Sequence, residues 1–228
     1  MHTFDDRGHV EPHGPAARRV VRHGATRLSV VKLSVGQMDN NCYVLSDIGT
    51  GTGIVIDAAD EPDRILEAVG DIDITTILTT HGHRDHWQAL AAVKRTTGAR
   101  VLHHLADAPM IPVPADGTVG DGDKVTIGAA AVEVLHTPGH TDGSVCVELR
   151  GPAEDRPEIT THLFTGDTLF PGGPGKTSGE AAFAQIMTSL RTRLFVFDDD
   201  TWVHPGHGED TTLGAERGDL DAWQARGW

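Results

Sequence analysis

The sequence predicts an α/β fold in the form of a sandwich, on three observations. Short apolar strand patterns alternate with amphipathic helical patterns, and they do so in two halves of comparable length. The chain of 228 residues is long enough for one domain with its own core. No stretch approaches the roughly 18 to 20 consecutive apolar residues that span a bilayer, so no contact with a membrane is expected.

The first 25 residues are predicted to form a loosely ordered extension, and residues 26–228 a single domain. Residues 1–25 are rich in His, Arg, Gly and Pro and show no apolar periodicity. They also lack the apolar run behind a basic end that marks a signal peptide. The pattern changes at Leu28, where the first predicted strand begins.

The first half is predicted to alternate strands with two helices. The strands are Leu28–Val35, Cys42–Ser46, Gly53–Asp57, Ile74–Thr80 and Arg100–His103. The helices are Glu61–Val69 and Trp87–Thr97. Pro62 suits the first turn of a helix, and Gly98 suits the position after the last one.

The second half begins with more strands and closes with helices. The predicted strands are Lys124–Ile127, Ala131–Leu135, Ser144–Leu149, Thr161–Thr165 and Thr201–Val203. The predicted helices are Glu180–Leu190 and a short closing helix, Thr211–Leu220.

The composition disfavours one class of function and favours another. The chain has 19 Lys and Arg against 33 Asp and Glu, a net charge of −14, which repels phosphate backbones and disfavours nucleic-acid binding. Its two cysteines cannot form a disulfide framework, so a reducing, cytoplasmic location is expected. Its 14 histidines point to metal binding if they cluster at workable spacings.

One short segment carries four potential metal ligands. His81, His83, Asp85 and His86 fall within six residues, directly after the predicted strand Ile74–Thr80. One ion could not comfortably take all four from so short a segment, whereas two adjacent ions could share them. Imidazole and carboxylate ligands suit zinc, manganese or ferrous iron.

Three later strand ends each present one further candidate ligand. His140 follows a Pro-Gly turn, Asp167 follows the predicted strand Thr161–Thr165, and His207 closes a His-Pro-Gly-His run. Each signal alone is weak, since an aspartate after a strand is commonly a turn former. Together with the first segment they predict a metal centre.

These residues resemble the metallo-β-lactamase superfamily. Its HxHxDH signature matches, in order, His81, His83, Asp85 and His86. The resemblance runs from about Leu28 to about Leu220. It implies an αβ/βα sandwich in which two mixed β-sheets are flanked by helices and the metals sit at one sheet edge. It also implies that Asp57 supports the site without binding metal.

Within the superfamily the blocks at 137–144, 166–170 and 205–208 look like those of the glyoxalase II branch. That resemblance implies two divalent metal ions, with zinc expected and iron or manganese possible. It assigns one ion to His81, His83, His140 and Asp167. It assigns the other to Asp85, His86, His207 and Asp167. The implied reaction is attack of a metal-bridging hydroxide on a small thioester or acyl ester, with Asp85 as a candidate proton donor.

Three further residues are singled out near the implied ligands. Lys176 lies nine residues after Asp167, where glyoxalase II has a lysine that contacts the carboxylate of the thiol carrier. A solvated lysine in a glycine-rich loop is an equal interpretation. Thr137 and Thr141 are expected beside the ligands rather than among them.

Other functions stay open at this stage. Persulfide dioxygenases share the same blocks but hold one iron, by the residues that match His81 (or His83), His140 and Asp167. A lactonase or weak β-lactamase fits the fold, and a non-catalytic metal-binding module is the alternative outside enzymes. Only 21 residues follow His207 in the sequence, so we do not expect the helical extension that helps glyoxalase II bind glutathione. The sequence does not determine the oligomeric state.

Overall fold

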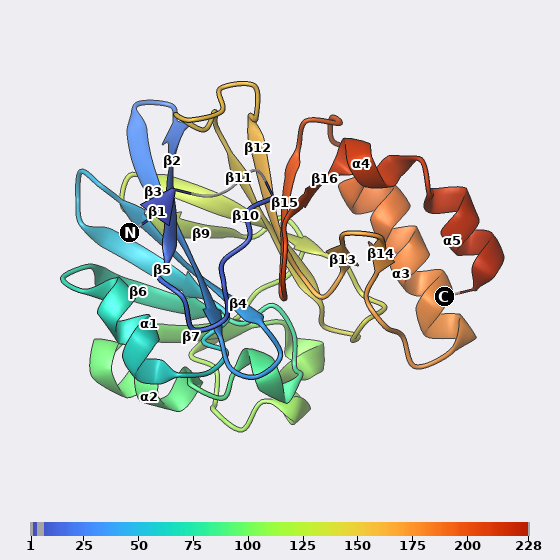
Figure 1. The fold of residues 1–228 in the computed structure, drawn as a ribbon. Helices are drawn as coiled ribbons and strands as arrows, with labels where there is room; N and C mark the ends of the chain where they lie inside the picture. Colours follow the sequence, from blue (N-terminus) through green and yellow to red (C-terminus); the bar gives the residue numbers. More distant parts are fainter. Residues whose placement is uncertain (1, 4–6, 228) are drawn as a thin grey trace.

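The computed structural model describes residues 2–3 and 7–227. Within them the strands form two large sheets that face each other (Figure 1). The first sheet contains β1 (His2–Thr3), β2 (Ala17–His23), β3 (Thr26–Val35), β4 (Asn40–Asp47), β5 (Thr52–Ile56), β6 (Asp73–Leu78), β7 (Arg100–His103) and β8 (Gly117–Thr118). The second contains β9 (Lys124–Ile127), β10 (Ala130–His136), β11 (Val145–Arg150), β12 (Thr161–Gly166), β15 (Trp202–Pro205) and β16 (Thr211–Thr212).

Both sheets are mixed. In the first, β2 to β5 pair antiparallel and β5 to β8 pair parallel. In the second, β12 and β15 pair parallel, while the other neighbours pair antiparallel. A small hairpin of β13 (Leu169–Phe170) and β14 (Gly173–Pro174) follows β12.

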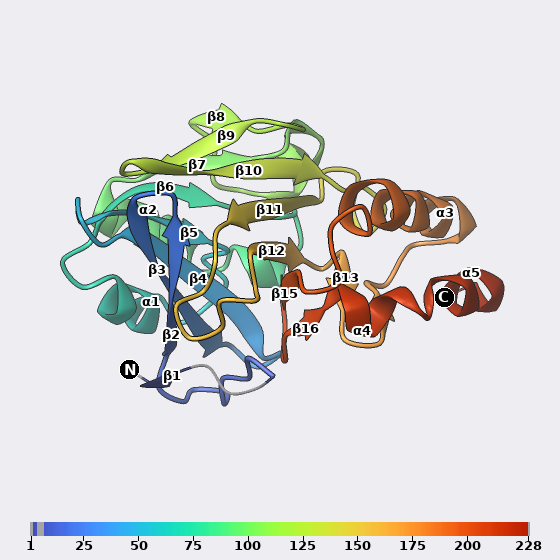
Figure 2. The same cartoon turned by 90° about the horizontal axis from the view of Figure 1, so that it is seen from above.

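The helices cover the outer faces of the sheets (Figure 2). On the first sheet lie α1 (Pro62–Val69) and α2 (Leu90–Thr97). Beside the second lie α3 (Glu180–Ser189), continued by a wider turn at Leu190–Leu194, then α4 (Leu213–Arg217) and α5 (Leu220–Arg226). No helix of the described chain is both long and apolar enough to cross a bilayer.

Three buried clusters show that the order of layers is helix, sheet, sheet, helix. On β4, Leu45 belongs to the cluster between the sheets, and its neighbour Val44 belongs to the cluster under α1 and α2. This alternation follows from the period of two in a strand, which points successive side chains to opposite faces. A third cluster joins Phe183 and Trp223 of the C-terminal helices to the outer face of the second sheet. The predicted αβ/βα sandwich is therefore confirmed.

The expectation of a loosely ordered segment over residues 1–25 was wrong for residues 17–23. They form β2, which pairs antiparallel with β3 along its whole length. The strand faces inward through Ala17, Arg19 and Val21. Arg19 is buried and its guanidinium lies over the Trp202 ring, 4.8 Å from the ring centroid. A charged residue at an inward position conceals the alternation on which strand prediction depends.

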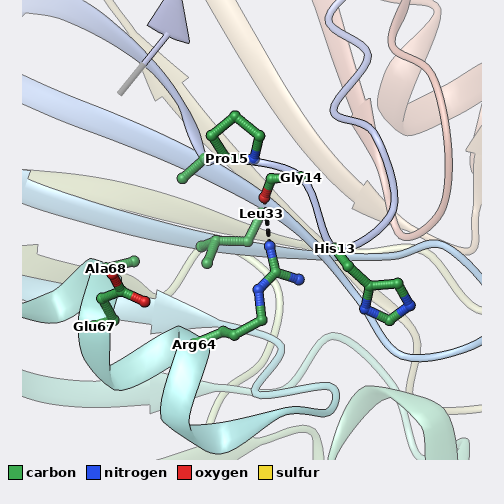
Figure 3. A pocket seen from close by; sticks show the side chains of 8 residues that line it. His13, Gly14, Pro15, Leu33, Arg64, Glu67 and Ala68 are labelled. Carbon is green, nitrogen blue, oxygen red and sulfur yellow. Dashed lines mark hydrogen bonds between the residues drawn. The ribbon is translucent and has the colours of Figure 1, made fainter.

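The segment before β2 is also docked on the domain. A cleft of about 480 Å³ lies between residues 13–16 and α1. Figure 3 shows Arg64 of α1 pointing across it to the carbonyl oxygen of Gly14, to which its guanidinium donates a hydrogen bond. A second group of the same guanidinium donates to Ser34 O at 2.6 Å. Arg64 therefore ties the N-terminal segment to β3.

Two predicted helices have different boundaries in the structure. The helix expected over Trp87–Thr97 begins at Leu90, because a single turn at Arg84–His86 belongs to the ligand-bearing loop. The closing helix expected over Thr211–Leu220 divides into β16, α4 and α5. The break falls at Gly218 and Asp219, between the two helices.

Candidate metal centre

The candidate ligands come from strand ends that meet at one edge of the sandwich. Since β10 and β12 both run antiparallel to β11, and β15 runs parallel to β12, the carboxyl ends of these three strands lie at the same edge. His140, Asp167 and His207 follow those ends. The loop after β6 reaches the same edge, where Val145 N donates to Thr80 O at 2.9 Å across the two sheets.

All seven residues named from the sequence come together there. Three overlapping groups have ligand atoms within 4.8 Å of one another. These groups are His81 with His83 and His140, His81 with His86 and Asp167, and Asp85 with His86 and His207.

The spacing of these atoms suits coordination to a common ion. His207 Nε2 lies 3.2 Å from His86 Nε2 and 3.3 Å from Asp85 Oδ2. Ligands around a tetrahedral ion with bonds of about 2.0 to 2.1 Å are separated by about 3.3 Å. Asp167 lies between two of these groups. Its Oδ1 is 3.3 Å from His86 Nε2, and its Oδ2 is 3.5 Å from His140 Nε2.

Two buried atoms in the cluster need partners that the described residues do not supply. His81 Nε2 and Asp167 Oδ1 are buried, and neither makes a hydrogen bond with any part of the chain that the structure describes. A buried polar atom without a partner costs free energy, and such an atom commonly marks an ion or water site. The imidazole and carboxylate ligands of the three groups fit divalent zinc, iron or manganese.

The other ring nitrogen of three histidines is anchored to an acceptor. His207 Nδ1 donates to Met38 O at 2.8 Å, and His140 Nδ1 donates to Lys176 O at 2.7 Å. His86 Nδ1 donates to Asp57 Oδ2 at 2.8 Å. Such anchors fix the tautomer and the ring plane, which leaves Nε2 of each ring free to bind a metal.

Asp57 supports the ligand loop, as the sequence predicted, and it is buried. Its Oδ1 accepts from Thr80 N at 2.7 Å, and its Oδ2 accepts from Thr80 Oγ1 at 2.7 Å in addition to His86 Nδ1. The carboxylate therefore holds both the loop backbone before His81 and one candidate ligand.

Asp107 is a second supporting carboxylate, which sequence reasoning missed. It is fully buried, and its Oδ2 accepts from Gly82 N and from Thr141 Oγ1, both at 2.7 Å. Its Oδ1 accepts from Gly143 N at 2.8 Å. Asp107 thus joins the backbone between the first two histidines to the loop that carries His140. Thr141 lies beside the ligands through this contact, as expected.

Asn40 is the third supporting residue, also missed from the sequence. Its Nδ2 donates to Asp85 Oδ2 at 2.9 Å and to Asp85 O at 3.1 Å. The only sequence signal was the polar turn over residues 39–41. Thr137 plays a more distant part, because its hydroxyl meets Thr168 Oγ1 at 3.1 Å, next to Asp167 in the chain.

Lys176 takes part in the centre through its main chain. Its carbonyl oxygen accepts from His140 Nδ1, while its side chain is exposed. The contact with a substrate carboxylate that the resemblance implies for its ammonium group remains a prediction.

The electrostatics of the centre follow from burial and from the carboxylates. Burial lowers the pKa of His81, and the neighbouring His86 lowers it further. Burial alone would also lower the pKa of His207, but the Asp167 and Asp85 carboxylates outweigh it and raise that pKa to about 9. Burial would raise the pKa of Asp167, but the nearby histidines hold it well below the usual range. Metal binding is therefore expected to release protons from the cluster.

Two further pairs of histidines lie outside this cluster. His162 and His204 stack on each other in the core, with ring centroids 5.5 Å apart. His136 stacks on His104 with ring centroids 4.1 Å apart, and its Nε2 pairs with Asp142 O. Cys42 and Tyr43 are buried in the core.

A family model matches most of the chain. Residues 35–207 match the model described as "Metallo-beta-lactamase superfamily", and this span contains every candidate ligand. The chain belongs to the metallo-beta-lactamase superfamily. Members of this superfamily are mostly metal-dependent hydrolases, which agrees with the ligand types at the centre.

The chain is similar both to uncharacterized proteins and to hydroxyacylglutathione hydrolases. An uncharacterized protein of Mycobacterium tuberculosis is 33% identical over 208 residues, with 80% of this chain and 92% of that protein covered. A hydroxyacylglutathione hydrolase of Rhizobium meliloti is 37% identical over 171 residues, with 74% of this chain and 62% of the relative covered. The chain therefore spans less than two thirds of that hydrolase.

Solved structures agree with the fold. ETHE1 from Myxococcus xanthus superposes with a TM-score of 0.69 at 31% identity, covering 82% of this chain and 81% of that one. TTHA1623, solved in a di-iron-bound form, superposes with a TM-score of 0.65 at 28% identity, covering 82% of this chain and 96% of that one.

Proposed function

We propose that this chain is a dinuclear metal-dependent hydrolase of small thioesters or acyl esters. The observation that carries the proposal is the arrangement of two ligand groups around the shared carboxylate of Asp167. Both groups are equally well supported: His140 and His207 each donate to a carbonyl oxygen, and Asp85 accepts from Asn40. The hydroxyacylglutathione hydrolase relatives and the di-iron form of TTHA1623 agree with this proposal.

The roles of the residues follow from their contacts. His81, His83 and His140 would hold one divalent ion, and Asp85, His86 and His207 the other, with Asp167 between them. Two bound ions would supply an activated water and positive charge opposite a carbonyl oxygen. Asp57, Asp107 and Asn40 keep the ligand loops in place before substrate arrives.

Asp85 suits the role of ligand better than that of proton donor. Burial would raise its pKa, but hydrogen bonding from His207 and the charge of His86 lower it, so the carboxylate stays ionised near neutral pH. A thioester needs little proton donation, because the leaving thiol has a pKa of about 8.5. An amide nitrogen would need an acid. The centre therefore favours thioesters and activated esters over amides.

The chain is further proposed to act on a small molecule in the cytoplasm, without a nucleic-acid or membrane partner. Its net charge is −14, and its cysteines, Cys42 and Cys146, are both buried and free.

Hydrolysis of simple acyl thioesters by zinc-loaded protein tests the proposal. We expect His86→Ala to lower kcat/KM by at least about 1000-fold, since it removes a ligand and a partner of Asp167. His13→Ala, which changes an exposed histidine outside the centre, should leave kcat/KM within twofold. Full activity in His86→Ala would overturn the dinuclear mechanism.

A mononuclear iron persulfide dioxygenase is the second candidate. The observation that favours it concerns His81, whose buried Nε2 has no hydrogen-bond partner in the described chain. Together with His83 and His140, His81 could hold one ion without the second group. It predicts oxygen uptake with a persulfide substrate by iron-loaded protein, and near-full activity in His207→Ala. The hydrolase predicts that His207→Ala is severely impaired.

A further inference from the structure

We propose that a cleft beside the candidate metal centre binds a carboxylate of the substrate, and that Arg84 is the residue that recognises it. This inference rests on the proposed function and narrows its substrate class. The cleft has a volume of about 480 Å³, and its lining includes Met38, Asn40, Arg84 and Asp85.

The position of the cleft connects it to the reacting groups. Asp85 Oδ2 accepts from Asn40 Nδ2 and lies 3.3 Å from His207 Nε2. One wall of the cleft is therefore the edge of the ligand cluster. A small molecule in the cleft can present a carbonyl group to that edge while its remainder occupies the cleft.

Arg84 supplies a positive charge that is not held in an ion pair with its neighbours. It is exposed in the turn between His83 and Asp85, and its guanidinium makes no hydrogen bond or ion pair with the described residues. The carboxylate of Asp60, which also lines the cleft, accepts from the amide of Glu61 at 2.7 Å. All five N–H donors of Arg84 are thus available to a ligand.

The charge balance favours a single carboxylate over a phosphate. A guanidinium binds a carboxylate through two parallel hydrogen bonds. One arginine beside the carboxylates of Asp60 and Asp85, in a chain of net charge −14, disfavours a more highly charged phosphate.

Met38 gives the cleft an apolar part. Its side chain is 58% exposed, while its carbonyl oxygen is fixed by His207 Nδ1. A thioether side chain adapts to short apolar chains of varied shape. The cleft therefore suits an ester or thioester with a carboxylate a few methylene groups from the reacting carbonyl.

Two pairs of thioesters test the inference and locate the carboxylate. One pair carries a terminal carboxylate or carboxamide on the acyl side, and the other carries them on the thiol side. In wild-type protein we expect kcat/KM to favour the carboxylate in one pair by roughly 10- to 100-fold. Arg84→Gln should reduce this ratio to near one. Arg95→Gln, which removes an exposed arginine on α2 outside the cleft, should keep it.

The outcomes separate this inference from the proposed function. Hydrolysis of all four thioesters without a carboxylate preference, or with one that survives in Arg84→Gln, overturns the role of Arg84 and leaves the hydrolase intact. If no thioester is hydrolysed, the proposed function fails. The cleft is then tested by titrating thioether analogues of the four compounds. Equal affinity for the carboxylate and carboxamide analogues in wild-type protein overturns the inference.

Discussion

Among the described residues, two clusters of histidine and aspartate differ in how their polar atoms are paired. In the metal centre, ring nitrogens of different histidines face each other, such as His83 Nδ1 and His140 Nε2 at 2.8 Å. In the second cluster, Lys32 and Asp210 are both fully buried and form an ion pair of 2.7 Å. The first cluster leaves His81 Nε2 without a partner in the described chain. We therefore regard it as incomplete without a cation.

The second cluster is complete in itself. Lys32 Nζ donates to Asp210 Oδ1 and to the carbonyl oxygens of Gly8 and Gly208, each at 2.8 Å or less. Asp210 Oδ2 accepts from Trp202 Nε1 at 2.8 Å and from His204 Nδ1 at 2.9 Å. Three donors and two carboxylate oxygens are all used, so the charges need no ligand.

The comparison shows that the cluster around Lys32 and Asp210 supports the metal centre. Lys32 holds the carbonyl of Gly208, directly after the ligand His207, and Asn41 Nδ2 donates to Pro205 O and Gly208 O at 2.9 and 3.0 Å. The complete cluster should therefore govern folding stability, and the incomplete one should govern metal binding and activity.

The largest expected effect on stability comes from breaking the complete cluster. Lys32→Met leaves the Asp210 charge buried without its cation, so the free energy of unfolding should fall by about 3 to 5 kcal/mol. Lys124→Met, at an exposed lysine on β9, should change it by less than about 0.5 kcal/mol. Urea unfolding with a chelator present measures both. A loss below 1 kcal/mol in Lys32→Met would contradict this division of roles.

Completing the other cluster should stabilise the fold by a smaller amount for each ion that binds. Zinc at about 100 times its dissociation constant should add about 2.7 kcal/mol per site to the free energy of unfolding. His86→Ala should show a reduced gain, because it retains only one intact group. Calorimetry with and without zinc tests this, and an equal gain in both proteins would show that His86 is not a ligand.

Asn40→Ala should weaken one half of the centre. Asn40 holds the carboxylate of Asp85, so its loss should lower metal affinity on the side of Asp85 by about 10- to 100-fold. Affinity on the side of His83 should change little. Competition with a chromogenic chelator resolves the two affinities. An equal weakening of both sites would indicate a general disturbance of the edge.

The smallest expected effect is on the loss of folding stability at low pH. Burial alone would raise the pKa of Asp210, but the charge of Lys32 outweighs it and holds that pKa below its usual value. The contribution to stability is therefore present above the unfolded pKa of about 3.9 and is lost as the pH falls through the folded pKa. Between pH 6 and pH 3, metal-free Asp210→Asn should lose less stability than wild-type protein. A steeper loss in the variant would contradict the pairing.

The candidate site shows which residues could be predicted from the sequence and which could not. Spacing and strand ends identified all seven candidate ligands, because ligands of one centre repeat a recognisable pattern, and the family resemblance identified Asp57. Asp107 and Asn40 could not be found this way. Each is an ordinary polar residue in a loop, and its role depends on which backbone amide or carboxylate the fold places beside it.

The fold itself was predicted from alternation of strands and helices, except where inward positions are charged. Arg19 hides β2, because a charged residue stands at an inward position, where Asp155 and the Trp202 ring are its partners. Lys32 lies within the predicted strand Leu28–Val35, yet its partners come from residues 8, 208 and 210. Such long-range pairing is set by the tertiary structure and leaves no local periodicity.

The number of bound metal ions tests the central claim most directly. Equilibrium dialysis of metal-free protein against zinc, followed by elemental analysis, should give two ions per chain in the wild type and one in His207→Ala. Two ions would establish that both groups around Asp167 bind metal. One ion in the wild type, unchanged in His207→Ala, would contradict the dinuclear account.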